Sequence, residues 1–238
     1  MRFFIAHFRA FFLSDEIVRK GTIIAQVPTG STFYIASAFG ASKTVSAISN
    51  ASEAVVSSTA HGFSNGDIVE MTSGWGRINL RAYRIKSVLA DSFVLEGCNT
   101  SNTTFFPPSG GVGSVRKATA FTQITTVMRP TSSGGEPKKV AYKFVESDVE
   151  YSLNDGFNAI NRTMDLDADS IGSAGYTALQ SLTEVQTDTI LKTVTKSGSF
   201  TLLSCKVALN EEVLMQEGQI NTVKVDFSGN SKSVRYAS

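Results

Sequence analysis

The chain has 238 residues, with 22 basic and 21 acidic side chains and a net charge of +1. This length is enough for one large domain or two modest ones. The balanced charge argues against a dedicated nucleic-acid-binding protein, which would carry a basic excess, and it gives no reason to expect binding to a membrane.

The supply of metal-binding and nucleophilic residues is small. The cysteines, Cys98 and Cys205, lie far apart and in no metal or redox spacing, so two reduced thiols are favoured over a disulfide. With His7 and His61 as the histidines, a zinc site or a Cys–His nucleophile pair is poorly supplied. No nucleophile-elbow or phosphate-loop pattern is present. We therefore expect a protein that is not an enzyme and that has no cofactor and no metal site.

Residues 1–20 alternate aromatic and basic side chains. Arg9 interrupts the apolar core that a signal peptide needs, and the segment is too short to span a bilayer. The alternatives are an amphipathic helix, an arm that docks on a neighbour, an extension outside the fold or a start-site artefact. The β pattern begins at Gly21, with strands expected at Thr22–Val27 and Thr32–Ala36 around a turn at Pro28–Gly30.

The stretch from Glu53 to Gly97 contains several short apolar runs that are rich in β-branched and aromatic residues and are bounded by turn residues. This pattern predicts short strands joined by tight turns. A turn-rich run from Asn99 to Gly113 follows, in which the glycines give a flexible loop. We expect a small closed or half-closed β-barrel inserted at residues 49–118, in which Trp75 is either a hydrophobic plug or an exposed loop tip. Its turn residues are His61, Gly62, Asn65, Gly66 and Asp67; for the histidine, a turn-stabilising hydrogen bond is favoured over catalysis.

The main domain is expected to comprise residues 21–48 and 119–238. A single convincing helix is predicted at Ser173–Val185, with Ser173 as its cap. A loop is expected at Pro130–Pro137. The expected strands are Ala120–Met128, Lys139–Val145, Asp148–Leu153, Phe157–Asp167, Thr189–Thr195, Ser199–Leu209, Gln219–Phe227 and Val234–Tyr236. The fold class is therefore mainly β: a β-sandwich or partial barrel with one packed α-helix and an inserted small β-barrel module.

Two of these strands alternate polar and apolar residues with a period of two, which predicts one buried face and one solvated face. The polar positions are Asp148, Glu150, Asn161, Thr163, Asp165 and Asp167. The run from Asp165 to Asp169 also suggests a calcium loop. Ser170 and Tyr176 stand where an EF-hand needs Gly and Glu, so calcium is disfavoured.

The inserted part resembles a small β-barrel module that recurs in bacteriophage virion proteins, similar to the first catalytic-cysteine half-domain of ubiquitin-activating enzymes. The shared positions are Ala60 to Phe63, Gly66, Asp67, Val69, Tyr83, Ile85, Asp91, Phe93, Leu95 and Gly97. Relatives usually carry Asn-Gly-Arg where this chain has Asn79-Leu80-Arg81, which is a departure from the pattern. The module carries no known chemistry of its own.

The flanking segments, from about Gly21 to the C-terminus, resemble the major tail tube proteins of long-tailed, non-contractile bacteriophages. The resemblance depends on the order of elements and on four local patterns: Ser132 to Glu136, Gly175 to Gln180, Val207 to Glu211 and Val234 to Tyr236. It implies hexameric rings that stack into a tube, in which each subunit adds strands to a continuous inner β-barrel. The implied partners are other copies of the chain, the tape-measure protein, the tail-tip and terminator proteins, and viral DNA that passes through the lumen without specific binding. The implied location is the virion tail, after assembly in the bacterial host cytoplasm, with no membrane involved.

Within such a tube, we expect the polar set Asp148, Glu150, Asn161, Thr163, Asp165 and Asp167 to face the lumen, because acids repel phosphate. Without the resemblance, these residues would simply be the solvated face of an ordinary sheet. The loop residues Ser132, Ser133, Gly134, Gly135 and Glu136 are expected to contact a neighbouring subunit or ring. Two alternatives remain open: a connector or terminator ring at the end of the same tube, and a host-surface binding module on a β scaffold.

Overall fold

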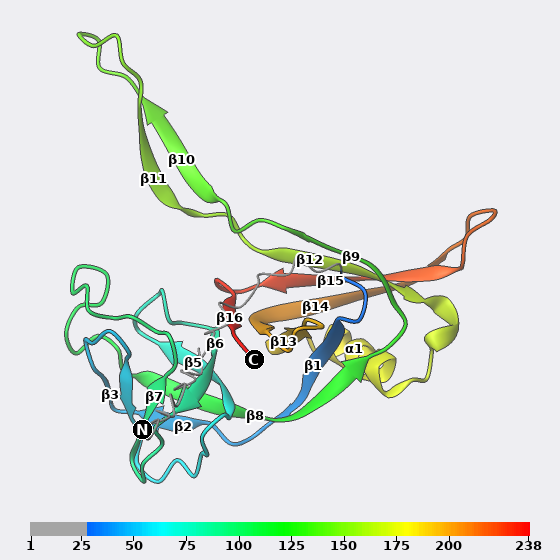
Figure 1. Cartoon of the computed structure of the whole chain (residues 1–238), viewed down its shortest axis with the longest axis horizontal. Helices are drawn as coiled ribbons and strands as arrows, with labels where there is room; N and C mark the ends of the chain where they lie inside the picture. The colour runs from blue at the N-terminus through cyan, green and yellow to red at the C-terminus, as the bar shows by residue number, and fades with distance from the viewer. Residues whose placement is uncertain (1–27) are drawn as a thin grey trace, which may run out of the picture.

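A computed structural model describes residues 28–238. The protein is mainly β, with a large, curled antiparallel sheet and one α-helix in this range (Figure 1). This confirms the expected fold class of a partial barrel with one packed helix. The predictions for residues 1–20 and for a strand at Thr22–Val27 lie outside the described residues. No helix of residues 28–238 is both long enough and apolar enough to cross a membrane.

The elements follow one another along the chain. They are β1 (Thr32–Phe39), β2 (Lys43–Val45), β3 (Ala47–Ile48), β4 (Val55–Ser57), β5 (Ile68–Ser73), β6 (Arg81–Lys86), β7 (Ser92–Leu95), β8 (Gly113–Ile124), β9 (Val127–Ser133), β10 (Pro137–Tyr142), β11 (Tyr151–Phe157), β12 (Asn161–Asp167), a 3-10 turn (Ala168–Ser170), α1 (Ala174–Val185), β13 (Thr189–Val194), β14 (Phe200–Leu214), β15 (Thr222–Gly229) and β16 (Val234–Tyr236).

The large sheet runs in the order β3-β4-β7-β6-β5-β8-β1-β13-β14-β15-β12-β9, with β2 on β8 and β16 on β14. The strands from β1 to β9 in this order curl around the main core. Period-two alternation builds this core, as in β15, where Val223, Val225 and Phe227 are buried between exposed Lys224 and Asp226. The core contains Phe33, Ile35, Ile124, Met164, Leu166, Tyr176, Leu179, Leu191, Leu203, Cys205, Val207, Leu209, Val223, Val225 and Phe227.

Helix α1 begins and ends as the sequence predicts. The Ser173 side chain accepts a hydrogen bond from the Tyr176 backbone N–H, and the chain leaves the helix at Gln186 in the left-handed region. The helix buries Tyr176 and Leu179 in the main core. It also lies along β14, because the Leu209 backbone N–H donates to Thr183 Oγ1 at 2.9 Å and Gln186 Nε2 donates to the Val207 carbonyl at 3.4 Å. The helix therefore satisfies backbone groups of β14 where β13 has ended.

A second core lies in the predicted insert. Strands β2 and β3 are separated by Ser46 alone, so the path β2-β8-β5-β6-β7-β4-β3 returns to its starting point. Strand β8 belongs to both halves of the molecule: residues 113–117 pair with β5, and residues 118–124 pair with β1. The second core contains Val45, Ile48, Ala54, Val56, Val69, Met71, Trp75, Ile78, Tyr83, Ile85, Phe93, Leu95, Cys98, Phe106 and Val115. The boundaries 49–118 and the likeness to the ubiquitin-activating-enzyme half-domain stay predictions.

The turn residues of this part have structural roles. His61 is buried, and its Nδ1 accepts a hydrogen bond from the Phe63 backbone N–H at 3.0 Å, as expected. Gly62 and Gly66 have φ values of +70° and +87°, which only glycine adopts at low cost. Asn65 Oδ1 accepts from the Val88 N–H at 2.9 Å. Asp67 Oδ2 accepts from the Ser64 N–H at 2.8 Å and forms an ion pair with Lys117.

Trp75 is the plug of the second core and not a loop tip. The side chain is 3% exposed, and its Nε1 donates to the Pro107 carbonyl at 2.9 Å. Gly110 and Gly111 pass so close to the indole that a Cβ atom at either position would lie within about 3 Å of it. The glycines of this loop therefore allow close packing on Trp75. At the departure from the insert's usual pattern, Leu80 adopts a left-handed φ of +49°.

A buried ionic network joins the two cores. Glu70 is 2% exposed and accepts hydrogen bonds from Arg116 Nε and Ser204 Oγ, both at 2.6 Å. Arg116 also donates to the Asp188 carbonyl at 2.9 Å and lies over the Phe39 ring at 4.0 Å. The network therefore ties β5 and β8 of the insert to β14 of the main domain.

The C-terminal strand forms a second link. Tyr236 Oη accepts from the Arg84 backbone N–H at 2.9 Å and donates to the Glu96 carbonyl at 3.3 Å. Burial raises the pKa of Tyr236 to about 12, so the hydroxyl keeps its proton near neutral pH. The Arg84 guanidinium hydrogen-bonds the Glu96 carboxylate and lowers its pKa. The insert is therefore held at fixed points on two sides.

Several predicted segments have other bounds in the structure. The expected strand Ala120–Met128 is divided between β8 and β9, and the expected strand Phe157–Asp167 is divided between β11 and β12. Most of the expected loop at Pro130–Pro137 belongs to β9 and β10, and the loop itself is Gly134 to Glu136. Proline is tolerated in β9 because this strand lies at the edge of the sheet, where one side needs no ladder donor. The expected strand at Asp148–Leu153 begins only at Tyr151, because the preceding residues form a hairpin tip.

Replacing Glu70 should test the buried network. The substitution Glu70→Ala leaves the Arg116 guanidinium without its carboxylate, so we expect the free energy of unfolding to fall by about 3 kcal/mol in urea denaturation. The matched control is Glu53→Ala. Glu53 pairs with Lys86 at the surface, where both side chains are at least 40% exposed, so we expect a much smaller loss than for Glu70→Ala. Equal losses for the two variants would contradict the role given to Glu70.

Candidate functional site

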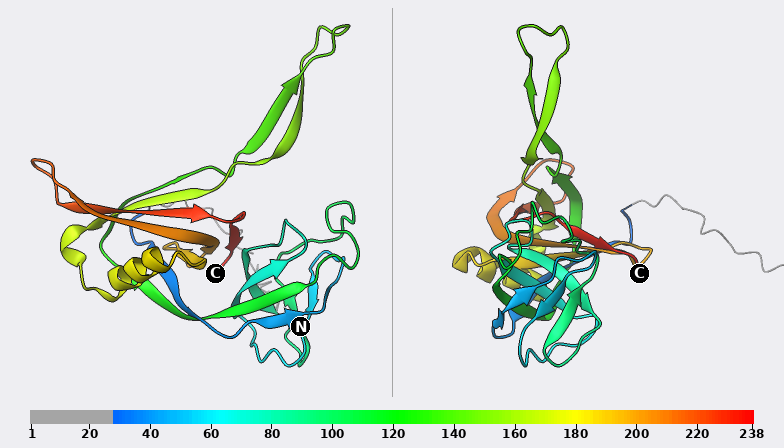
Figure 2. Two further views of the ribbon diagram at one scale, coloured as in Figure 1. Left: turned by 180° about the vertical axis from the view of Figure 1, so that it is seen from behind. Right: turned by 90° about the vertical axis from the view of Figure 1, so that its left-hand side faces the viewer.

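A two-stranded arm projects from the body of the molecule. Strands β10 and β11 pair only with each other and form a sheet separate from the large one. Figures 1 and 2 show the arm extending well beyond both cores. An isolated two-stranded hairpin is marginally stable in water at best, so burial against something else would stabilise this arm.

One face of the arm is apolar. Val140 lies opposite Leu153, and Tyr142 lies opposite Tyr151, so these four side chains share a face. The Tyr142 and Tyr151 rings are stacked with centroids 5.5 Å apart, and Phe144 completes the aromatic cluster at 5.4 Å from Tyr142. Most of these side chains are exposed, Leu153 by 61% and Phe144 by 54%.

The opposite face of the arm is mostly polar. It carries Lys139, Ala141, Ser152 and Asn154, which pair across the two strands. The alternation predicted from the sequence is therefore real, but the apolar side is not covered by any described part of the chain. A contiguous exposed apolar face of this kind indicates an interaction surface.

The base of the arm depends on two glycines. Gly134 and Gly135 both have a φ of +82°, and a Cβ atom on Gly134 would lie 1.7 Å from the Ala159 carbonyl oxygen. The Gly135 N–H donates to the Asn158 carbonyl, and the Asn158 N–H donates to the Glu136 carbonyl, both at 3.0 Å. These contacts fix where the chain leaves β9 and enters the arm.

The five residues predicted as a contact loop therefore divide between two places. Ser132 and Ser133 end β9 and pair with Arg162 and Asn161 of β12. Gly134, Gly135 and Glu136 form the corner. The sequence identified the corner but missed the arm beyond it, because exposed Tyr and Leu residues in an alternating strand look like core residues.

The six residues predicted to face a lumen also divide. Asn161, Thr163, Asp165 and Asp167 lie on one face of β12, while Met164 and Leu166 between them are buried, as expected. Asp148 and Glu150 do not join that face, because they lie in the exposed tip of the arm. The six residues therefore lie in two separate places, and their lumen-facing role stays a prediction.

The β12 face carries both signs of charge. Asp165 lies opposite Lys224 and forms an ion pair with Arg129 at 3.1 Å. Thr163 Oγ1 donates to Asp226 Oδ1 at 2.5 Å. Strand β14 lies on the other side of β15 and contributes Lys206, Ala208 and Asn210 to the same face. The register therefore places basic residues beside the acids on this face, and its lumen-facing role stays a prediction.

Asp167 and Asp169, which suggested a calcium loop, have a structural explanation. Asp167 Oδ1 accepts from the Asp169 backbone N–H at 3.0 Å and caps the short 3-10 turn. Within residues 28–238, no group of three or more His, Cys, Asp or Glu side chains is arranged to hold a metal ion. Cys98 and Cys205 are both buried and free; burial raises the pKa of both thiols, that of Cys205 to about 12.

Within residues 28–238, strands β9 and β14 of the large sheet each have an edge that no other strand covers completely. Strand β9 pairs on one side only, with β12, and so ends the sheet. Strand β14 extends past its pairing with β13. Helix α1 covers this side of β14 as far as Leu209, and Glu211 to Leu214 then have no described partner strand on the same side. Unpaired backbone groups on such edges are templates for pairing with another chain.

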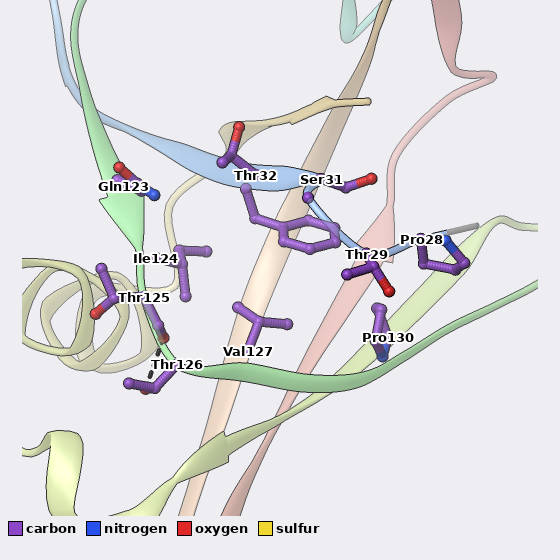
Figure 3. A pocket seen from close by; sticks show the side chains of 12 residues that line it. Pro28, Thr29, Ser31, Thr32, Gln123, Ile124, Thr125, Thr126, Val127 and Pro130 are labelled. Atoms are coloured by element: carbon purple, nitrogen blue, oxygen red, sulfur yellow. Dashed lines mark hydrogen bonds between the residues drawn. The ribbon is translucent and has the colours of Figure 1, made fainter. Parts of the chain in front are cut away.

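A cavity of about 640 Å³ lies between the start of β1 and the corner that joins β8 to β9 (Figure 3). Phe33 and Ile124 line it together with Thr125, Thr126 and Val127. None of its lining residues is ionisable. The cavity therefore offers shape and hydroxyl groups but no acid, base or nucleophile pair for catalysis.

A family model described as "Phage tail tube protein, TTP" matches residues 73–238 of this chain, which is more than half of its length. The match begins inside the predicted insert and continues through the arm, the helix and the C-terminal strand. No curated protein sequence matches the chain.

Adding one methyl group at the base should loosen the arm. In Gly134→Ala, the new Cβ meets the Ala159 carbonyl at a left-handed φ, so we expect a destabilisation of about 1–3 kcal/mol and faster hydrogen exchange at the Gly135 and Asn158 amides. The matched control is Gly76→Ala, where no atom lies within 4 Å of the added Cβ. Unchanged exchange at the arm base in Gly134→Ala would contradict this role for Gly134.

Proposed function

The chain belongs to the phage tail tube protein family, whose members are structural proteins of the virion tail and not enzymes. From this premise we propose that copies of the chain close into hexameric rings and that the rings stack into a tube. The proposed tube is the conduit for the genome. The single observation that carries the stacking step is the arm, because its apolar face is exposed on the isolated chain.

Ring closure would use the two open strand edges. We place the free edge of β9 on one copy beside the end of β14 on the next, so that β9, β12, β15 and β14 of every copy join one continuous inner barrel. The uncovered backbone groups of β9 and of the end of β14 would then have partners. Helix α1 would remain outside this pairing, because it covers β14 only as far as Leu209.

The polar face of the inner strands would line the lumen. This face includes Asn161, Thr163, Asp165 and Asp167, now without Asp148 and Glu150. The acids Asp165 and Asp226 lie among the bases of this face, and Asp165 pairs with Arg129, which weakens the attraction of the face for phosphate. Such a wall would hold DNA less tightly than a continuous track of bases.

The proposed partners follow from this geometry. Other copies of the chain contact the arm and the strand edges, while the tape-measure protein and then viral DNA occupy the lumen. Tail-tip and terminator proteins would cover the open edges at the two ends of the tube. We place the assembled protein in the virion tail after assembly in the host cytoplasm. The insert would be a fixed part of the wall, because Glu70 and Tyr236 anchor it.

Electron microscopy tests the proposed function directly. We expect the purified protein, at rising concentration or with purified tail tips, to form hollow filaments with a regular axial repeat. A variant with residues 137–157 replaced by a short Gly-Ser turn should close into rings that do not stack, because it lacks the arm. Only closed rings from the unaltered protein would indicate a connector. Monomers that persist with tail tips present would contradict the proposal.

The lumen assignment predicts a charge effect. The substitution Asp165→Lys removes the acid partner of Arg129 and adds a base opposite Lys224, so tubes should form but retain short duplex DNA at low salt. Retained DNA should be protected from nuclease, since it lies inside, and should be released as salt rises. The matched control is Asp169→Lys, on the 3-10 turn. Bound DNA that nuclease removes completely would place Asp165 on the outer surface and overturn the assignment.

A further inference from the structure

We propose that the tip of the arm on one copy docks on an aromatic patch centred on Lys192 of a second copy. This inference rests on the proposed self-assembly and names the surface that receives the arm. It is carried by two sets of groups on the described chain that match each other in chemistry: the exposed acids and apolar side chains of the tip, and a half-buried lysine beside aromatic rings that pack on a third buried cluster.

The tip combines three acids with three apolar side chains. Glu146, Asp148 and Glu150 are all exposed, and none lies within ion-pair distance of a base in residues 28–238. Between and beside them are Phe144, Val145 and Val149, of which Val145 is fully exposed. A valine left bare among carboxylates has no stabilising contact on the isolated chain.

The receiving patch lies on the face of β1, β8, β13 and β14 that points away from the main core. Tyr34 is opposite Lys192, and Phe121 is opposite Ala36, so their side chains stand on one face. Lys192 Nζ lies 5.6 Å from the centre of the Phe121 ring and 5.0 Å from that of Phe200. All four side chains are half-buried. We call Tyr34, Phe121, Lys192 and Phe200 the Lys192 patch.

Lys192 has no acid partner within the described residues. Its charge is held over two aromatic rings, an arrangement that gains strength when water is removed. The tip supplies what the patch lacks, carboxylates for the ammonium group and apolar side chains for the rings. Matched charge with aromatic anchors is typical of the residues that dominate protein interfaces.

No described residue outside the arm contacts the tip, which lies far from the rest of residues 28–238. Figures 1 and 2 show the tip at the far end of the arm, remote from β1 and β13. Other candidate receivers fit less well. The cavity beside Phe33 has no charged lining residue, and the insert cations Arg84, Lys86 and Lys117 already have acid partners. Two other cations are competitors in chemistry, because each lies over an exposed phenylalanine: Arg77, 3.5 Å from the Phe105 ring, and Lys232, 4.3 Å from the Phe157 ring.

A charge exchange tests the pairing. One variant carries Lys192→Glu, a second carries Glu146→Lys, Asp148→Lys and Glu150→Lys, and a third combines all four changes. We expect each of the first two to raise the protein concentration needed for filament growth by about tenfold or more, because like charges meet at the contact. The combined variant should recover most of this loss. Arg77→Glu is the matched control, since it inverts another cation that lies over an exposed phenylalanine.

Thermal unfolding of each variant separates lost folding from lost assembly. Lys192→Glu with an unchanged melting temperature, weak filament growth and rescue by the lysine tip would support the pairing. Normal filament growth of both the Lys192→Glu variant and the variant with three lysines in the tip would overturn the pairing while leaving the tube proposal intact. Growth lost in Arg77→Glu but not in Lys192→Glu would assign the tip to the insert instead. Absence of filaments from the unaltered protein with tail tips would instead be a failure of the proposed function.

Discussion

Backbone hydrogen bonding at strand edges is the constraint on which the rest of this structure depends. A strand exposes a row of N–H and C=O groups on each side, and each row must meet water or a partner. Strand β14 shows three solutions along its 15 residues: pairing with β13, side chains of α1 on the Leu209 and Val207 groups, and an open end. Strand β9 also has an edge without a partner strand in residues 28–238. The described chain therefore forms its cores but leaves part of its sheet unpaired.

Local chemistry predicted most of the architecture. Ser173 capped the helix where expected, and the alternation around Met164 and Leu166 identified the buried face of β12. These features depend on residues a few positions apart, so the sequence contains the whole signal. Asn65, Gly66 and Asp67 formed turn contacts for the same reason.

Predictions failed where the outcome depended on distant partners. Alternation in Tyr151 to Leu153 showed that two faces differ, but it could not show that nothing covers the apolar one. The bases that lie among the acids of β12 were not foreseen for a similar reason, because the register that brings Lys224 opposite Asp165 joins residues 59 positions apart. Glu70 was not recognised at all, since its partners Arg116 and Ser204 lie 46 and 134 positions away.

The continuity of strand β8 has a mechanical consequence. The strand forms backbone hydrogen bonds on both sides of the junction between the two cores: residues 113–117 pair with β5, and residues 118–124 pair with β1. A force applied to the insert therefore loads several backbone hydrogen bonds in shear at once, rather than bending a loop. In the proposed tube, the insert would stiffen the wall that the main sheet builds. A tail made of such subunits would therefore resist local compression at the position of β8.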